Sequence, residues 1–199
     1  MDHLWAPWRL AYVSSSAGKR RKGVPNELSA WPEAEDHDCV FCNMIASVRW
    51  AIRHGMKRDD AEEAALILEQ RTNCFVCLNR FPYSTGHVLV VPYRHEASLA
   101  ALDLPAAEEM IGTARRLESA LRQTYRPDGL NLGINLGEAA GAGVADHLHL
   151  HQLPRWSGDT NFMTVTASTR VLPEELKVTW SRLREALTRC NAEDLPSTP

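Results

Sequence analysis

Hydrophobic and polar residues alternate most regularly in ADHLHLHQLPRW, at residues 145–156. His147, His149 and His151 occupy every second position, and leucines stand between them. Successive side chains of an extended strand point to opposite faces. The pattern therefore predicts a strand that presents three imidazoles on one face and an apolar stripe on the other.

The rest of the pattern predicts neighbouring strands separated by single helices. Two apolar runs between Cys74 and Pro92 indicate a β-hairpin with a longer loop. After Asp103, with Pro105 in the first turn, apolar residues recur at helical spacing. The segments LNLGINLG and NFMTVTAS add strands, and a last helix begins near Pro173. This order lacks regular strand–helix–strand alternation, which is typical of an α+β fold with an antiparallel sheet.

The first part of the chain is less regular. Residues 14–37 carry a basic run, two prolines and few apolar residues, so we predict a loop or wrapping arm outside the core. MIASVRWAIRHG and RDDAEEAALILEQ each begin as a helix, and the second passes into a strand at Ala65 to Glu69. We predict one domain over 1–199, with an N-terminal arm at 1–38, a core at 39–170, and a C-terminal helix and tail at 171–199.

Composition narrows the class of protein. With 199 residues, 44% of them hydrophobic, the chain is long enough for one large core. The formal net charge is −3 and no long basic stripe occurs, which argues against binding of duplex nucleic acid. The sequence shows neither 18 consecutive apolar residues nor a basic, apolar leader, so we expect no membrane association and a cytoplasmic protein.

Five cysteines, an odd number, favour metal-binding or core thiols over disulfides in a reducing compartment. Cys39 and Cys42 have the spacing of a zinc pair, although two ordinary thiols would show the same pattern. Cys74 and Cys77 share this spacing, but residues three apart in a strand point to opposite faces and cannot easily bind one metal. We interpret them as a core and a surface thiol, and Cys190 as packed at the end of the last helix.

Three interpretations compete for the alternating histidines. They could line a polar strand face, supply two ligands to a catalytic zinc as H-x-H, or act in nucleophilic catalysis at phosphorus. Strict alternation of three imidazoles beside an apolar stripe speaks against the first. The spacing alone leaves the other two open.

A wider set of motifs carries a resemblance. HLHLHQLPR resembles the H-x-H-x-H-x-x signature, with x apolar, of the histidine triad family of nucleotidyl hydrolases and transferases. The hairpin, LNLGINLG and CVFC fall in the same order as in that family, over roughly residues 39–170. LWAPWRLAYV and PRWSGDTNFM further resemble the branch that includes bacterial diadenosine tetraphosphate phosphorylases. The resemblance implies the histidine-triad fold, a homodimer, and release of a nucleoside mono- or diphosphate from a dinucleoside polyphosphate, with Mg²⁺ accompanying the nucleotide.

The same resemblance implies roles for single residues. His149 would be the nucleophile, and His151 would contact the scissile phosphate and give a proton to the leaving group. The resemblance also implies a zinc ion bound by Cys39, Cys42, His95 and His147. Because a Cys₂His₂ set leaves no open coordination position, this zinc would be structural. The nucleotide would contact Asn79, Asn135, His87, Gly141 and Gly143, although turn or structural roles fit both asparagines and His87 equally well.

Two features depart from the family pattern. The connection from Gly137 to Asp146 contains no Ser, Thr or Gln, which puts one phosphate hydrogen bond in doubt, and Gln152 stands where an apolar residue is usual. A zinc-stabilised nucleotide-binding or adaptor module without turnover is therefore the alternative function. Hydrolysis and phosphorolysis differ only in whether water or phosphate releases the nucleotide from His149, and the sequence leaves both open.

Overall fold

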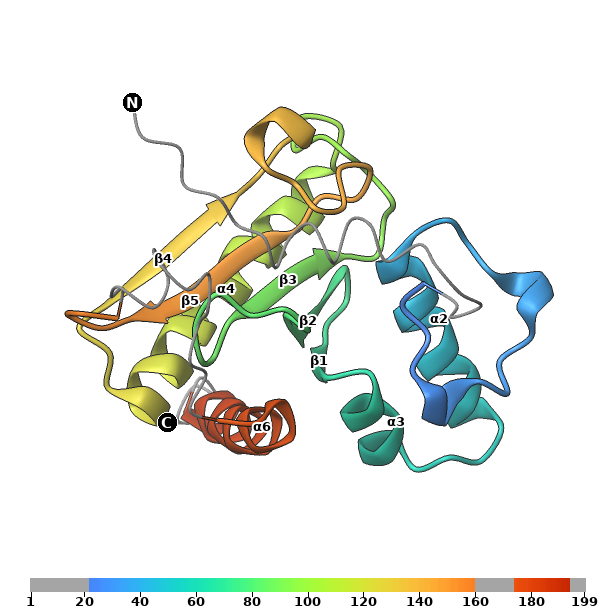
Figure 1. Ribbon diagram of the computed structural model, residues 1–199, viewed down its shortest axis with the longest axis horizontal. Helices are drawn as coiled ribbons and strands as arrows, with labels where there is room; N and C mark the ends of the chain where they lie inside the picture. The colour runs from blue at the N-terminus through green and yellow to red at the C-terminus, as the bar shows by residue number, and fades with distance from the viewer. Residues whose placement is uncertain (1–21, 160–173, 194–199) are drawn as a thin grey trace, which may run out of the picture.

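A computed structural model describes residues 22–159 and 174–193. Their strands form one antiparallel sheet in the order β1-β2-β3-β5-β4 (Figure 1). The strands are β1 Ile67–Gln70, β2 Cys74–Leu78, β3 Val88–Pro92, β4 Gly129–Ile134 and β5 Leu150–Arg155. The longer helices are α2 Val40–Arg53, α3 Arg58–Ala64, α4 Leu104–Tyr125 and α6 Leu176–Glu193. The predicted α+β class with an antiparallel sheet is confirmed.

Local sequence signals explain the boundaries of the hairpin and of the long helix. β2 and β3 pair from Cys74↔Pro92 to Leu78↔Val88, and all of their residues are buried. Helix α4 begins after Asp103, whose side chain accepts a hydrogen bond from the Ala106 N–H at 3.0 Å. It ends at Arg126, which adopts the left-handed conformation with φ 46°. Both elements match the sequence-based prediction.

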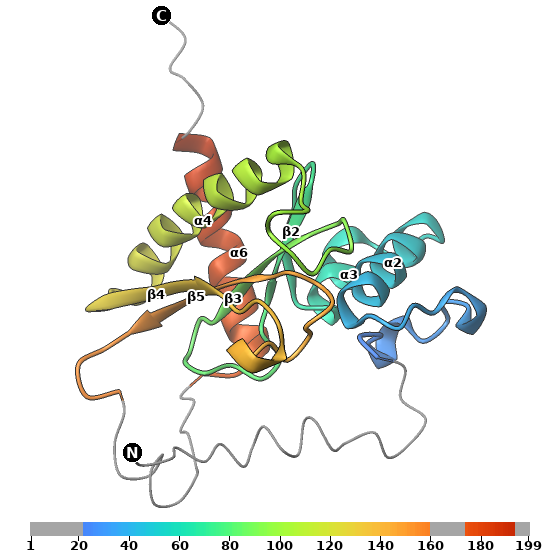
Figure 2. The same ribbon diagram turned by 90° about the horizontal axis from the view of Figure 1, so that it is seen from above.

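Helices pack on both faces of the sheet (Figure 2). α4 and α6 cover one face, and α2 and α3 cover the β1–β2–β3 part of the other. Cys74 lies in the first layer and Cys77 in the second, each with 0% exposure. The two thiols do point to opposite faces, but the prediction of a surface thiol is wrong because helices cover both. Cys190 is buried, as predicted.

The segment before α2 belongs to the core. Val24, Leu28 and Trp31 are buried and pack with Phe41 of α2. Short 3₁₀ turns, η1 (Asn26–Leu28) and η2 (Glu33–Glu35), carry this chain across the helix. Of the predicted arm at 14–37, the described residues 22–37 have mostly exposed side chains, but Val24, Leu28 and Trp31 are part of the core, which the prediction did not include. Burial of the three apolar side chains of Val24, Leu28 and Trp31 stabilises the packing of this otherwise polar segment against α2.

The histidine strand differs slightly from the prediction. β5 begins at Leu150, so His147, at a bend, and His149 lie in the segment just before it. The predicted strand NFMTVTAS falls outside the described residues. In the part of the chain that the structure describes, no helix is both long and apolar enough to cross a membrane.

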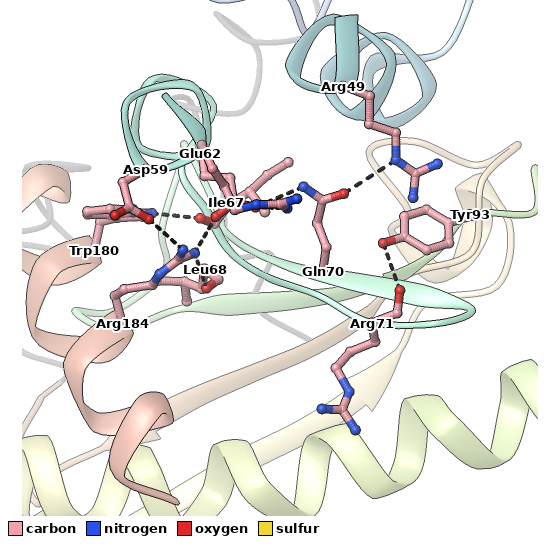
Figure 3. Close-up of polar contacts among 11 residues, drawn as sticks. Arg49, Asp59, Glu62, Ile67, Leu68, Gln70, Arg71, Tyr93, Trp180 and Arg184 are labelled. Atoms are coloured by element: carbon pink, nitrogen blue, oxygen red, sulfur yellow. Dashed lines mark hydrogen bonds and ion pairs between the residues drawn. The ribbon is translucent and has the colours of Figure 1, made fainter. Parts of the chain in front are cut away.

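Helix α6 protects the outer edge of β1 (Figure 3). The Trp180 indole N–H donates to the Ile67 carbonyl at 2.7 Å, and the Arg184 guanidinium donates to the Leu68 carbonyl at 2.7 Å. The register of β1 against β2 shifts between Ile67 and Glu69, which lets two consecutive carbonyls face the helix. An edge strand that would otherwise expose backbone groups is thereby closed.

Glu62 of α3 completes this contact. Its side chain is 2% exposed and lies 2.6 Å from Arg184 and 3.3 Å from Arg58. It also accepts a hydrogen bond from the Gln70 amide at 2.8 Å. A buried carboxylate is tolerated only when it is paired in this way. α3, β1 and α6 are therefore joined by one polar cluster.

We predict that Arg184→Met lowers the free energy of unfolding by about 3 kcal/mol, because Glu62 then keeps a buried charge without its best partner. Arg189→Met is the matched control on the same helix, since Arg189 pairs only with exposed Glu185, and it should cost less than about 0.5 kcal/mol. Urea denaturation measures both. Equal losses would show that Glu62 does not depend on Arg184.

Candidate active site

The three histidines meet on the face of the sheet that carries α2, beyond the strands that this helix covers. β5 lies between β3 and β4, and His151 pairs with Leu89 on one side and Gly133 on the other. His147 and His149 are 1% and 4% exposed, and His151 is half-buried. A Cβ at Gly133 would meet no described atom within 4 Å. Gly133 therefore places no side chain against His151.

His147 is oriented by the backbone of β3. Its Nε2 lies 2.9 Å from the Pro92 carbonyl, which can only accept, so Nε2 carries the proton. Nδ1 then holds a lone pair, and it lies 3.2 Å from the Cys39 sulfur. Burial lowers the pKa of His147 to about 4, so the ring is neutral near pH 7. A neutral imidazole with a free lone pair is the form that binds metals.

His149 shows the opposite tautomer. Its Nδ1 lies 2.8 Å from the carbonyl oxygen of His147, so Nδ1 donates and Nε2 carries the lone pair. Burial lowers the pKa of His149, which favours the neutral ring. Both effects leave Nε2 unprotonated, as a nucleophile requires.

A chain of hydrogen bonds reaches His151 from the hairpin loop. The Tyr83 backbone N–H donates to His87 Nδ1 at 3.1 Å, so the proton of His87 lies on Nε2. His87 Nε2 is 3.0 Å from His151 Nδ1 and donates to it. The remaining nitrogen of a neutral His151, Nε2, then carries a proton. The structure thus gives neighbouring imidazoles complementary forms, an acceptor at His149 and a donor at His151.

Phe41 is a site residue that the sequence reasoning missed. It lies between the two cysteines of CVFC and is 5% exposed. Its ring centroid is 5.4 Å from that of His147 and 5.0 Å from that of His149. An apolar residue inside a C-x-x-C pair was the available signal, but the spacing did not show which side chain it would contact. Phe41 fixes and dehydrates the imidazole of His149.

Four predicted metal ligands come together. Their donor atoms, the two thiol sulfurs and one nitrogen from each imidazole, all lie within 4.8 Å of one another. Cys39 caps α2 and Cys42 lies in its first turn, His95 follows β3, and His147 precedes β5. The pKa of the Cys42 thiol is raised to about 12 by burial and by Cys39, so a bound cation has to displace its proton.

The chemistry of this donor set fits zinc. Two thiolates and two imidazoles are a standard tetrahedral zinc set, whereas Mg²⁺ takes oxygen ligands. Among the residues that the structure describes, this is the one group of three or more His, Cys, Asp or Glu side chains placed to hold a metal. A protein-bound Mg²⁺ is therefore not supported.

The predicted nucleotide contacts are placed less uniformly. Asn79 bonds within the hairpin loop, because its oxygen accepts from the Phe81 N–H at 2.9 Å and its amide nitrogen lies 3.3 Å from His87 Nδ1. Asn135 directly follows β4. One more step in the β4–β5 register would bring it opposite His149. Both asparagines lie on segments that border the histidines.

The glycine-rich connection has fewer available N–H groups than predicted. Gly137 and Gly141 have positive φ, at 81° and 95°, and flank the 3₁₀ turn η3 (Glu138–Ala140). The N–H groups of Ala140, Gly141 and Ala142 donate to the carbonyls of Gly137 or Glu138. The Gly141 N–H is therefore used within the turn, whereas among the described residues no bond of this kind involves the Gly143 N–H.

An α+β fold whose antiparallel sheet carries three alternating histidines is the arrangement of a histidine triad protein. Comparison with known proteins leads to the same family. The HIT domain model matches residues 60–158. The chain is 33% identical to the AP-4-A phosphorylase of Mycobacterium tuberculosis over 180 residues, which is 90% of this chain and 80% of that protein. This chain belongs to the HIT domain family, and these matches support a nucleotide hydrolase or transferase activity.

Solved structures show the same fold. A zinc-bound histidine triad family protein from Mycobacterium smegmatis is 28% identical, with a TM-score of 0.58, and the match covers 79% of this chain and 98% of that one. A hypothetical histidine triad nucleotide-binding protein from Sulfolobus tokodaii gives a TM-score of 0.60 at 22% identity, over 81% of this chain and 99% of that one. The second shows the fold alone.

Proposed function

We propose that this protein cleaves dinucleoside polyphosphates, with diadenosine tetraphosphate as substrate, through a nucleotidyl group carried on His149. One observation supports this proposal most directly. The His149 Nδ1–H is held by the His147 carbonyl, so the buried Nε2 carries a lone pair. The AP-4-A phosphorylase at 33% identity supports the choice of substrate.

The proposed reaction has two displacements. His149 Nε2 attacks the α-phosphorus, a P–N bond forms, and the P–O bond to the remaining phosphates breaks with its electron pair on oxygen. His151, whose Nδ1 accepts from His87, gives its Nε2 proton to that oxygen and ATP leaves. In the second displacement an acceptor gives its proton to His151 Nε2 and attacks phosphorus, the P–N bond breaks, and the electron pair returns to His149.

The acceptor in the second displacement determines whether the reaction is a hydrolysis or a phosphorolysis. Attack by water releases AMP, and attack by inorganic phosphate releases ADP. Product analysis with diadenosine tetraphosphate, with and without phosphate, separates the two. The relative favours phosphorolysis, which predicts ADP plus ATP when phosphate is present. Nucleotide binding without any product would instead establish a binding module.

His149→Ala should reduce turnover by at least roughly 10³-fold while nucleotide binding persists, because only the covalent route is lost. His54→Ala is the control, since His54 is an exposed histidine at the end of α2. Intact mass after a rapid quench without acid should show a nucleotidyl adduct on the wild type and the control only. An adduct on His149→Ala would contradict the proposal.

We also propose a structural zinc at Cys39, Cys42, His95 and His147. When bound, zinc would supply a tetrahedral cross-link between α2, the segment after β3 and the segment before β5. His147 would then have two roles, because its ring would bind the zinc and its carbonyl orients the ring of His149. The zinc-bound relative from Mycobacterium smegmatis supports the choice of metal.

Purified wild type should contain one zinc per chain, measured by elemental analysis after preparation without chelators. Cys39→Ser should lose the metal and unfold more readily, because zinc in Cys/His sites contributes on the order of 10 kcal/mol to folding. Cys74→Ser should keep the metal, since Cys74 is buried on the opposite face of the sheet. A wild type without zinc would refute the site.

A homodimer through β4 is the proposed assembly. β4 is the last strand of the described sheet, and Leu132 on it and Leu136 just after it are 55% and 49% exposed. Ile111 on α4 is 58% exposed as well. A strand edge that no described strand pairs with, next to exposed leucines, favours pairing with a second copy. As a separate proposal, we place this protein in the cytoplasm.

The dimer is tested by sedimentation. The wild type should have twice the chain mass of 22.3 kDa, whereas Leu132→Asp should shift it toward monomer because it places a charge in the apolar contact. Val178→Asp is the control, because Val178 is 47% exposed on α6. A wild-type monomer would contradict this assembly.

A further inference from the structure

A polar cluster outside the proposed reaction lies next to the cysteine pair. Asn43 of α2 is 1% exposed, and among the described residues its side chain bonds to main-chain groups of Lys22 and His37. Its oxygen accepts from the His37 N–H at 2.7 Å. Its amide nitrogen donates to the carbonyls of Lys22 and His37, each at 2.9 Å. A buried amide with its donors and acceptor used in this way is held in one orientation.

These bonds close a loop. Lys22 and His37 are the two ends of the segment that contains η1 and η2, and Asn43 holds both ends together. A surface ion pair between Lys22 and Asp38 joins the same ends. His37 lies two residues before Cys39, so the position of the first cysteine depends on how firmly the loop end is held.

A second contact presses this loop against the cysteine turn itself. Gly23 has φ +77°, and a Cβ there would lie 2.1 Å from the carbonyl oxygen of Val40. Val40 stands between Cys39 and Cys42 in the sequence CVFC. Only a residue without a side chain permits this approach of two backbones. The loop therefore bears directly on the turn that spaces the two sulfurs.

We infer that Asn43 and Gly23 are positioning residues for the metal site, because they clamp the loop of residues 22–37 onto the CVFC turn. The inference rests on the proposed zinc. Groups that hold metal ligands in place typically change metal affinity by about 10–100-fold when they are removed. A clamped turn returns a dissociated thiolate to the metal before a second ligand leaves. An unclamped turn lets the cysteines separate.

The test compares two variants with two matched controls. Asn43→Ala removes the bonds to both loop ends, and Ser47→Ala removes a buried hydroxyl on the same helix that bonds only to the Met44 carbonyl, at 3.0 Å. Gly23→Ala introduces both backbone strain and the clash with Val40. Gly55→Ala introduces strain alone, since Gly55 has φ +97° and its Cβ would meet no described atom within 4 Å.

The measurement is the rate at which the zinc-loaded protein transfers its metal to an excess of a chromogenic chelator. Asn43→Ala and Gly23→Ala should release zinc about 10–100-fold faster than the wild type, and both controls should release it at the wild-type rate. The absorption spectrum of the Co²⁺-substituted protein gives an independent reading. Tetrahedral coordination should be disturbed in Asn43→Ala and Gly23→Ala and unchanged in both controls.

The outcomes separate positioning from general stability. Each variant's melting temperature is measured on the zinc-loaded protein, and release is followed well below it, so mere destabilisation cannot mimic faster release. If Asn43→Ala does not fold, Asn43→Asp keeps the shape and the bond from His37 but loses both donated bonds, and it should still release zinc faster. Wild-type release rates in both clamp variants would overturn the inference. A wild type without zinc would refute the proposed site and this inference together.

Discussion

The hydrogen bond from His149 to the carbonyl of His147 is the interaction on which the site depends. It uses the backbone of one histidine to choose the tautomer of another, at a distance of 2.8 Å. The ring of His147 is itself held by the Pro92 carbonyl of β3, and its other nitrogen faces the thiols. One residue therefore links the sheet, the proposed metal and the proposed nucleophile. Movement of the chain at His147 would disturb all three.

The layers of the fold make this link possible. α4 and α6 bury one face of the sheet, while α2 covers only part of the other and brings Phe41 against His147 and His149. The histidines are thus desolvated from one side, and their β5 neighbour β4 contributes Gly133, which has no side chain to fill the space beside His151. Burial lowers the pKa of His149, which favours the neutral ring.

Much of the fold follows from local patterns in the sequence. The hairpin of β2 and β3 and the capped helix α4 have strong periodicity and clear end signals, and both form as predicted. Predictions that depend on tertiary neighbours were weaker. Periodicity cannot show that helices cover both faces of the sheet, so it does not predict that Cys74 and Cys77 are both fully buried. The same reason explains why Val24 and Trp31, in a polar segment, were assigned outside the core.

The candidate site, like the fold, could be predicted from the sequence only in part. Spacing and resemblance identified the histidines and the cysteines, and the structure brings the four proposed ligands within reach of one metal. Sequence could not supply the tautomers, because they are set by the carbonyls of His147 and Pro92 and by the Tyr83 N–H. It also could not show that the N–H groups of Ala140, Gly141 and Ala142 donate within the turn around η3, since those bonds depend on its dihedral angles.

The most direct test of the account is the protonation of the imidazole nitrogens, measured by ¹⁵N NMR at neutral pH on the zinc-loaded protein. The account predicts that His149 is neutral with its proton on Nδ1, and that His87 carries its proton on Nε2. A proton on Nε2 of His149 in the resting protein would contradict it, because the nitrogen assigned to attack phosphorus would then have no lone pair to offer.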